Sequence, residues 1–259
     1  MLLNLQELYR YRSLFWALVK RHLAMRYRGS VLGFLWSFLN PLLLMLVYTL
    51  VFRYYIRFEQ VENYTIFLFC GLLPWIWFTS SLSEGTSSIV SSGHLITKSL
   101  FPAHLLPCVS IATNMIHFIF SLPLLFLFMG YMHIPFNLSL LFLPVIVLLQ
   151  YIFMHGLVLM LASLNVFYRD VQHLLGNVLT LLFFLSPILY PISAVPERFR
   201  FTMEWNPIAQ TTLFYHQVVL DGLLPDLNAL IFVFICGLLM LLSGNFVFNH
   251  YRESFAECI

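Results

Sequence analysis

"RYRGSVLGFLWSFLNPLLLMLV", residues 26–47, decides how this chain folds, because two arginines and a Gly29-Ser30 break precede a long apolar run. A helix that crosses a bilayer needs roughly 20 mostly apolar residues. We therefore predict a membrane span over about 31–52, with a kink where Pro41 lacks a backbone donor and frees the carbonyl of Ser37. The run is too long for the core of a signal peptide, and no small-residue cleavage site follows it.

The composition extends this interpretation to the whole chain. Of 259 residues, 61% are hydrophobic and only 9% are charged. A soluble domain of this length would need more charge, so much of the surface faces lipid. The net charge of +2 gives no support for a nucleic-acid partner. The four cysteines form no C-x-x-C pair, so neither a disulfide framework nor a zinc site is predicted.

Six apolar runs are long enough to be spans, and we predict an all-α integral membrane protein with a single domain over 1–259. The expected spans cover 31–52, 65–91, 105–129, 138–164, 173–190 and 227–249. The fifth is short, and Pro187 near its end predicts a broken or tilted helix. An interfacial helix over 1–28 is expected before the six-span bundle of 31–249, and a cytoplasmic tail over 250–259 after it.

The positively charged residues set the expected orientation. With the N-terminus inside, nine arginines and lysines flank the spans on the cytoplasmic side and four flank them on the outside. Cytoplasmic loops carry the excess of positive charge. Six spans then place both termini in the cytoplasm.

The segment before the first span, "LQELYRYRSLFWALVKRHLAMRY" (5–27), has the pattern of a basic amphipathic helix. Its apolar residues share one helical face and most basic residues lie opposite. We expect this helix to lie at the membrane surface. Packing of the same face on a partner is an alternative that does not exclude the first. The residues that mark it are Arg10, Phe15, Lys20, Arg21, Arg26 and Arg28.

The second span ends in an unusually polar sequence, "TSSLSEGTSSIVSS" (79–92). Ser80, Glu84, Ser87 and Ser91 fall at i, i+4, i+7 and i+11 and form one stripe on a helix. A carboxylate within a span is costly unless it faces water or a partner. The stripe is therefore either a hydrophilic wall of a conduit or a helix-packing surface on which Glu84 pairs with a cation.

Aromatic residues make up 17% of the chain, and "LLPWIWF" (72–78) concentrates them near the expected outer end of the second span. Aromatic belts at membrane interfaces explain most tryptophans of membrane proteins. Aromatic faces also stack on sugar rings, and composition does not separate the two roles. Our candidate substrate path consists of Trp36, Trp75, Trp77, Phe78, Ser80, Glu84, Ser87 and Tyr190.

Two loops on the expected cytoplasmic side are candidates for contact with a partner. "SGHLITKSLFPAHLLP" (92–107) has room for one short helix that ends before Pro102. "LNVFYRDVQHLL" (164–175) contains the Arg169-Asp170 pair.

The longest segment on the expected outer side covers 190–222. Its Asn206-Pro207 pair is a helix-start signature, with Asn as the cap and Pro in the first turn. We expect a helix from there through about Gln217, within an ordered aromatic cap.

Enzyme signatures are mostly missing from the sequence. A phosphate-binding loop needs a Gly-Lys pair at a helix start, and neither Lys20 nor Lys98 follows a glycine. The nine histidines show no metal-ligand spacing. His117 and His155 lie within expected spans, where hydrogen bonds between helices are favoured over catalysis.

Two functional classes stay open at this point, a membrane-embedded enzyme and a secondary transporter. A membrane-embedded acyl or glycosyl transferase would need a carboxylate and a histidine at one membrane face, for which Arg169, Asp170 and His173 are the candidates. A secondary transporter normally has an internal repeat and ionisable residues at the midplane. We find no repeat, and Glu84 is the lone acid within an expected span.

Several segments, in this order and spacing, resemble the membrane subunit of ABC-type polysaccharide exporters, the family of O-antigen, capsule and teichoic acid permeases. The resemblance covers essentially the whole chain. The segments are "RYRGSVLGFLWSFLNP" (26–41), "LFCGLLPWIWF" (68–78), "SSGHLITKSLFP" (91–102), "NVFYRDV" (165–171), "LSPILYPISAVP" (185–196) and "WNPIAQ" (205–210).

The resemblance implies a homodimer in the bacterial inner membrane that binds two copies of a separate ATPase subunit. No cofactor would bind this chain, since ATP and Mg would bind the ATPase. The implied cargo is a polysaccharide on an undecaprenyl-diphosphate carrier, and a permease for a small lipid or drug is the related alternative.

The resemblance also implies roles for two groups of residues. The ATPase contact would consist of His94, Leu95, Ile96, Thr97, Lys98, Ser99, Leu100, Phe101, Arg169 and Asp170. Short gating helices at the outer mouth would contain Pro196, Phe199, Trp205, Asn206 and Pro207.

Overall fold

A computed structural model of the chain describes residues 7, 9–55, 61, 63–98 and 101–258. Within them, five helical segments are long and apolar enough to cross a membrane. Each of the five overlaps one of the spans that the sequence predicted. Their bounds are Gly33–Tyr55, Tyr64–Ser91 (α4), Leu105–Tyr131 (α6), Leu138–Phe167 and Leu227–Ser254.

Shorter helical turns extend three of these segments at their ends. The first consists of η1 (Gly33–Leu35), α3 (Trp36–Thr49) and the π-helix η2 (Leu50–Tyr55). The fourth consists of η3 (Leu138–Phe142) and α7 (Leu143–Phe167), and the fifth of α11 (Leu227–Tyr251) and η6 (Arg252–Ser254).

The fifth predicted span is a shorter helix than expected. The helix α8 runs Asp170–Phe184, which is 15 residues and about 22 Å long, against about 30 Å for the hydrocarbon core of a bilayer. It ends before Pro187, as a helix usually does ahead of proline. The prediction that this span continues to residue 190 is therefore wrong at its outer end.

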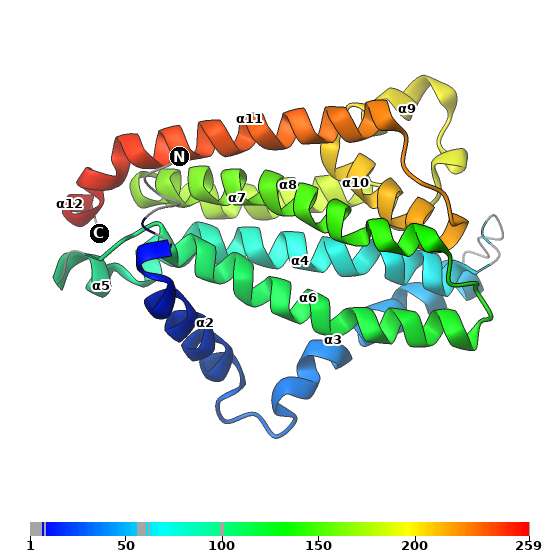
Figure 1. The fold of residues 1–259 in the computed structure, drawn as a ribbon, viewed down its shortest axis with the longest axis horizontal. Helices are drawn as coiled ribbons and strands as arrows, with labels where there is room; N and C mark the ends of the chain where they lie inside the picture. The colour runs from blue at the N-terminus through cyan, green and yellow to red at the C-terminus, as the bar shows by residue number, and fades with distance from the viewer. Residues whose placement is uncertain (1–6, 8, 56–60, 62, 99–100, 259) are drawn as a thin grey trace.

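The helix α4 lies at the centre of the bundle (Figure 1) and packs against α3, α6, α7 and α8. In its most apolar window 72% of the residues are buried, against 17–44% for the other four long segments. Because α4 is covered on most sides, most of its polar side chains face other helices, and Ser83 is an exposed exception.

The helices α7 and α11 run side by side (Figure 1) and approach very closely. A Cβ atom added at Gly244 would lie 2.0 Å from the carbonyl oxygen of Gly156, and one added at Gly156 would lie 2.2 Å from that of Met240. Small residues let two backbones meet in this way.

The outer segment folds into α9 (Glu197–Glu204), α10 (Pro207–His216) and the π-helix η5 (Gln217–Asp221). The predicted helix start is confirmed, since the Asn206 side chain accepts a hydrogen bond of 3.0 Å from the Ile208 amide. Most residues of α10 are buried, and the helix packs against α4, α7 and α11. It is therefore built into the bundle and is more than a surface cap.

Both ends of the described chain lie at the same end of the bundle, opposite α9 (Figure 1). The Arg252 guanidinium lies 3.9 Å from the Glu7 carboxylate. The predicted tail is packed, because α12 (Phe255–Cys258) contacts both α7 and the short helix α5 (Gly93–Lys98). Phe255 is fully buried in a second small core with Ile89, Leu159, Ala162, Val166 and Phe248.

Candidate functional site

A polar network lies where the helix α2 (Arg12–Tyr27) joins the bundle. A turn with positive φ at Gly29 (+79°) and Gly33 (+48°) reverses the chain between α2 and α3, at the break that the sequence predicted. In α2 the predicted apolar face points inward, with Val19 buried, and the helix packs against α6. The turn therefore places Arg26 and Tyr27, the last residues of α2, against α4 and α6.

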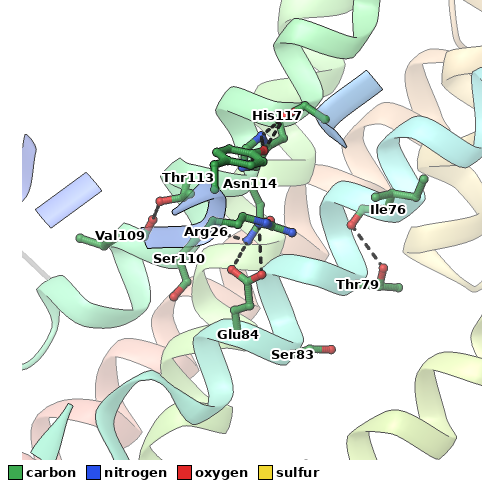
Figure 2. Close-up of polar contacts among 12 residues, drawn as sticks. Arg26, Ile76, Thr79, Ser83, Glu84, Val109, Ser110, Thr113, Asn114 and His117 are labelled. Atoms are coloured by element: carbon green, nitrogen blue, oxygen red, sulfur yellow. Dashed lines mark hydrogen bonds and ion pairs between the residues drawn. The ribbon is translucent and has the colours of Figure 1, made fainter. Parts of the chain in front are cut away.

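Arg26, Glu84 and Asn114 form a closed triangle of polar contacts (Figure 2). An Arg26 Nη1 atom lies 3.3 Å from Glu84 Oε1 and donates to Asn114 Oδ1 at 3.0 Å, while Asn114 Nδ2 donates to Glu84 Oε2 at 2.8 Å. The Glu84 side chain is 33% exposed, about 10 Å before the end of α4. Of the two roles proposed for Glu84, pairing with a cation is the one that the structure shows.

A second group joins α2, α3 and α6 one turn further into the bundle. The Tyr27 hydroxyl and Ser37 Oγ lie 3.1 and 2.9 Å from His117 Nδ1, so the predicted hydrogen bond between helices at His117 is confirmed. Ser121 Oγ donates to the Ser37 carbonyl at 3.3 Å. That carbonyl is the one that Pro41 leaves without its helical partner, so the cost of the proline is met by a neighbouring helix.

The network borders a cavity of about 250 Å³ between α2, α3, α4 and α6. Of the predicted substrate path, Trp36, Trp77 and Ser80 line this cavity. Glu84 and Ser87 line a second cavity nearer the termini, and Trp75 and Phe78 face α7 and α10 on another side of α4. Tyr190 lies apart, where its hydroxyl donates to the Phe184 carbonyl. The eight residues therefore do not form one path within a single chain.

Sequence reasoning missed the α6 side of the network, although a signal for it was present. Ser110, Asn114, His117 and Ser121 fall at i, i+4, i+7 and i+11, the spacing of the stripe on α4. Two polar stripes of equal spacing on neighbouring apolar helices indicate that the helices face each other.

The segments of the predicted ATPase contact lie together at the end that holds the termini. His94 is exposed on α5, while Ile96 and Phe167 both pack on the second core. Arg169 and Asp170 are exposed where α7 passes into α8. Ser99 and Leu100 lie outside the described residues, and Thr97 and Lys98 are placed by their backbone in α5.

His104 connects this region to the start of the chain. Burial lowers its pKa, against the opposing effect of the Glu7 carboxylate, so the imidazole is neutral near pH 7. Its Nδ1 lies 3.2 Å from Glu7 Oε2. The loop before α6 is therefore held to both ends of the chain, since Glu7 also faces Arg252.

The predicted outer gate lies at the opposite end of the bundle, on α9 and at the start of α10. Phe199 and Trp205 are exposed, and the Trp205 ring meets Phe232 of α11 at 6.0 Å. Pro196 and Asn206 stand at the starts of α9 and α10, and Pro207 is in the first turn of α10.

The arrangement of Arg169, Asp170 and His173 gives no support for the transferase alternative. Arg169, Asp170 and His173 are all exposed, and none makes an ion pair in the part of the chain that the structure describes. The same part holds no group of three or more His, Cys, Asp or Glu side chains that could bind a metal.

We expect the coupling energy between Arg26 and Glu84, which joins α2 to the bundle, to be only about 1–2 kcal/mol. The value is small because both side chains are partly exposed and water screens the pair. The measurement is a double-mutant cycle of Arg26→Ala and Glu84→Ala, with unfolding followed in detergent. Arg28→Ala combined with Glu84→Ala is the control, since Arg28 is exposed beyond the end of α2. Equal coupling in the two cycles would contradict the assignment.

Comparison with known proteins gives matches over nearly the whole chain. The ABC-2 type transporter family matches residues 13–218. The chain is 42% identical to the O-antigen export system permease protein RfbA of Myxococcus xanthus over 98% of each chain. It is 32% identical to a protein of that name from Klebsiella pneumoniae over 93% of each chain. Identity to the polysialic acid transport protein KpsM of Escherichia coli is 22%, over 92% of this chain and 93% of KpsM.

Proposed function

Because the chain belongs to the ABC-2 type transporter family, we propose that it is the permease subunit that exports a lipid-linked polysaccharide, working as a homodimer powered by a separate ATPase. The protein is a multi-pass protein of the bacterial inner membrane. The observation that carries the proposal is the likeness to the O-antigen export permease of Myxococcus xanthus, which covers 98% of both chains.

The energy source in this proposal is another chain. ATP and Mg bind the ATPase, which docks on α5 and on the exposed turn at Arg169 and Asp170. Three supports hold that surface in place: Phe255 in the second core, the contact of α12 with α5, and the contact of Glu7 with His104. A movement of the ATPase would thus be passed to α4, α6 and α7, which all meet this end.

The cargo in this proposal is a glycan on an undecaprenyl-diphosphate carrier. The polar stripes of α4 and α6 bond to each other and to α2, so these side chains are already occupied. The cavity beside Trp36, Trp77 and Ser80 is then the polar surface nearest the first span. Exposed apolar residues such as Leu46 of α3 and Leu181 of α8 supply faces for a second copy or for lipid. A channel for a polymer would form between two copies, since the predicted path is divided within one.

The experiment that tests the proposal is purification of the tagged protein from native membranes in mild detergent, with mass spectrometry of the proteins that come with it. We expect a stoichiometric ATP-binding subunit. An intact dimer that carries no such subunit would contradict the proposal.

Reversing the charge of Lys98 together with Phe101→Ala should uncouple ATP hydrolysis from export. Both positions lie in the proposed docking segment, outside the long apolar helices, so membrane insertion should be unchanged. We expect at least about tenfold less exported polymer, as for loss of roughly 1.4 kcal/mol of coupling, and accumulation of lipid-linked polymer inside. Arg53→Glu with Tyr55→Ala is the control, because it also reverses one basic charge and truncates one aromatic ring, but on η2. Normal export in the first variant would remove α5 from the contact.

A further inference from the structure

A second cavity, of about 410 Å³, lies between α2 and the helix ends nearest the termini. Its walls come from α2, the last turns of α4, the start of α5 and the first turns of α6. It is separate from the cavity beside Trp36, and Glu84 is one of its lining residues.

The cavity carries nitrogen donors that the fold leaves unused, and one of them is the cationic guanidinium of Arg21. Arg21 lines it and has no hydrogen bond or ion pair among the described residues. His22 also lines it, and its Nδ1 is buried without a partner in the same part of the chain. His94 contributes a third side chain from α5. An arginine has five N–H donors in a fixed fork that matches the oxygens of a phosphate.

The other polar groups of the cavity do not compete with these donors. The charge of Glu84 is balanced by Arg26 at 3.3 Å, and Asn114 donates to its second oxygen. The hydroxyls of Ser87, Ser88 and Ser91 donate to carbonyls of their own helix. The charge that remains unbalanced in the cavity is therefore positive.

The remaining lining is mostly apolar. It consists of Leu18, Met25, Leu95, Leu106 and Val109, together with Ser92 and with Ser110, whose hydroxyl donates to the Leu106 carbonyl. A guanidinium and two imidazoles beside an apolar wall, under a basic helix at the end of a membrane bundle, fit an amphiphile with an anionic head. A soluble anion would use the donors and leave the apolar wall exposed to water.

We propose that this cavity binds the phosphate group of an anionic lipid headgroup. Arg21 and His22 hold the phosphate oxygens, and the apolar wall receives the first carbons of the lipid. This role goes beyond the proposed export function, because a phospholipid of the bilayer would occupy the site whatever cargo the protein moves. The same phosphate chemistry is present on a polyprenyl-phosphate carrier, and the experiment separates the two sources.

The test is native mass spectrometry of the full chain released from nanodiscs that contain phosphatidylglycerol or phosphatidylcholine. We expect the wild-type protein to retain phosphatidylglycerol, and Arg21→Ala to lower the retained fraction about tenfold, as for loss of a charged contact of roughly 1.4 kcal/mol. Lys20→Ala is the matched control, since it removes the same charge from the next position, which does not line the cavity. Arg21→Lys should keep only part of the binding, because the ammonium keeps the charge and lacks the guanidinium fork.

Competition identifies the source of the phosphate. If polyprenyl phosphate displaces phosphatidylglycerol from the wild-type protein and not from Arg21→Ala, the site is supported and its ligand is the carrier. If polyprenyl phosphate does not displace phosphatidylglycerol, the ligand is a lipid of the bilayer. Displacement by inorganic diphosphate alone would overturn a lipid site. Equal loss in Lys20→Ala and Arg21→Ala would overturn the proposal, because general attraction to a basic helix would then explain the binding.

Discussion

Replacing Gly244 with leucine should prevent the chain from accumulating as a folded protein. The two backbones touch at this point, because even a Cβ atom at Gly244 would lie 2.0 Å from the Gly156 carbonyl oxygen and 2.9 Å from its Cα. The atoms that clash are backbone atoms, which cannot change rotamer as a side chain can, so α7 and α11 would have to separate. Overpacking of a core commonly costs 1–3 kcal/mol, and separating the helices at their closest contact should exceed about 3 kcal/mol.

The measurement is size-exclusion chromatography of the detergent-extracted protein together with its thermal unfolding temperature. Gly176→Leu in α8 and Gly130→Leu in α6 are the controls, because an added Cβ meets nothing within 4 Å at either position. Both controls should be folded, since leucine is the better helix former. If Gly244→Leu unfolded at the wild-type temperature, the close approach of α7 and α11 would be wrong.

Replacing Phe255 with alanine should leave the protein inserted but loosen the surface proposed to receive the ATPase. Phe255 is fully buried, with its ring 5.4 Å from that of Phe248, in the core on which Ile96 of α5 also packs. Loss of a buried phenylalanine costs about 3–5 kcal/mol. The small size of this core and its place at the end of the bundle make local opening the expected result, with the long helices intact.

Hydrogen exchange gives the direct measurement. The amides of α5 should exchange about 100-fold faster in Phe255→Ala, which corresponds to a local loss of roughly 3 kcal/mol, while those of α4 keep their protection. Polymer export should fall in parallel. Glu257→Ala on the same helix is the control, since Glu257 is exposed. Unchanged exchange in α5 would show that α12 does not support it.

The elements that the sequence predicted correctly are those that depend on few neighbours. The five long apolar segments follow from the length of bilayer that an apolar helix must cross. The start of α10 at Asn206-Pro207 is local, because cap and proline act within one turn. The freed carbonyl of Ser37 also follows from the covalent structure of Pro41.

The site was predicted in part. The stripe that contains Glu84 was visible from its spacing, but whether it faced a conduit or a cation stayed open until Arg26 was placed 3.3 Å away. The substrate path was predicted by residue type, and those residues lie on several sides of α4. Residue type does not determine which face of a central helix a side chain occupies.

An all-helical membrane protein could thus be predicted from the chain alone, because hydropathy and local motifs depend on the solvent and on nearby residues. The packing of α10 within the bundle, the contact of α12 with α5, and the meeting of Arg26, Glu84 and Asn114 became known only from the folded arrangement. Within a bilayer every apolar face is equally acceptable to lipid, so hydrophobicity does not select partners for a helix. Close backbone contacts and polar pairs select them, and these depend on side chains far apart in the sequence.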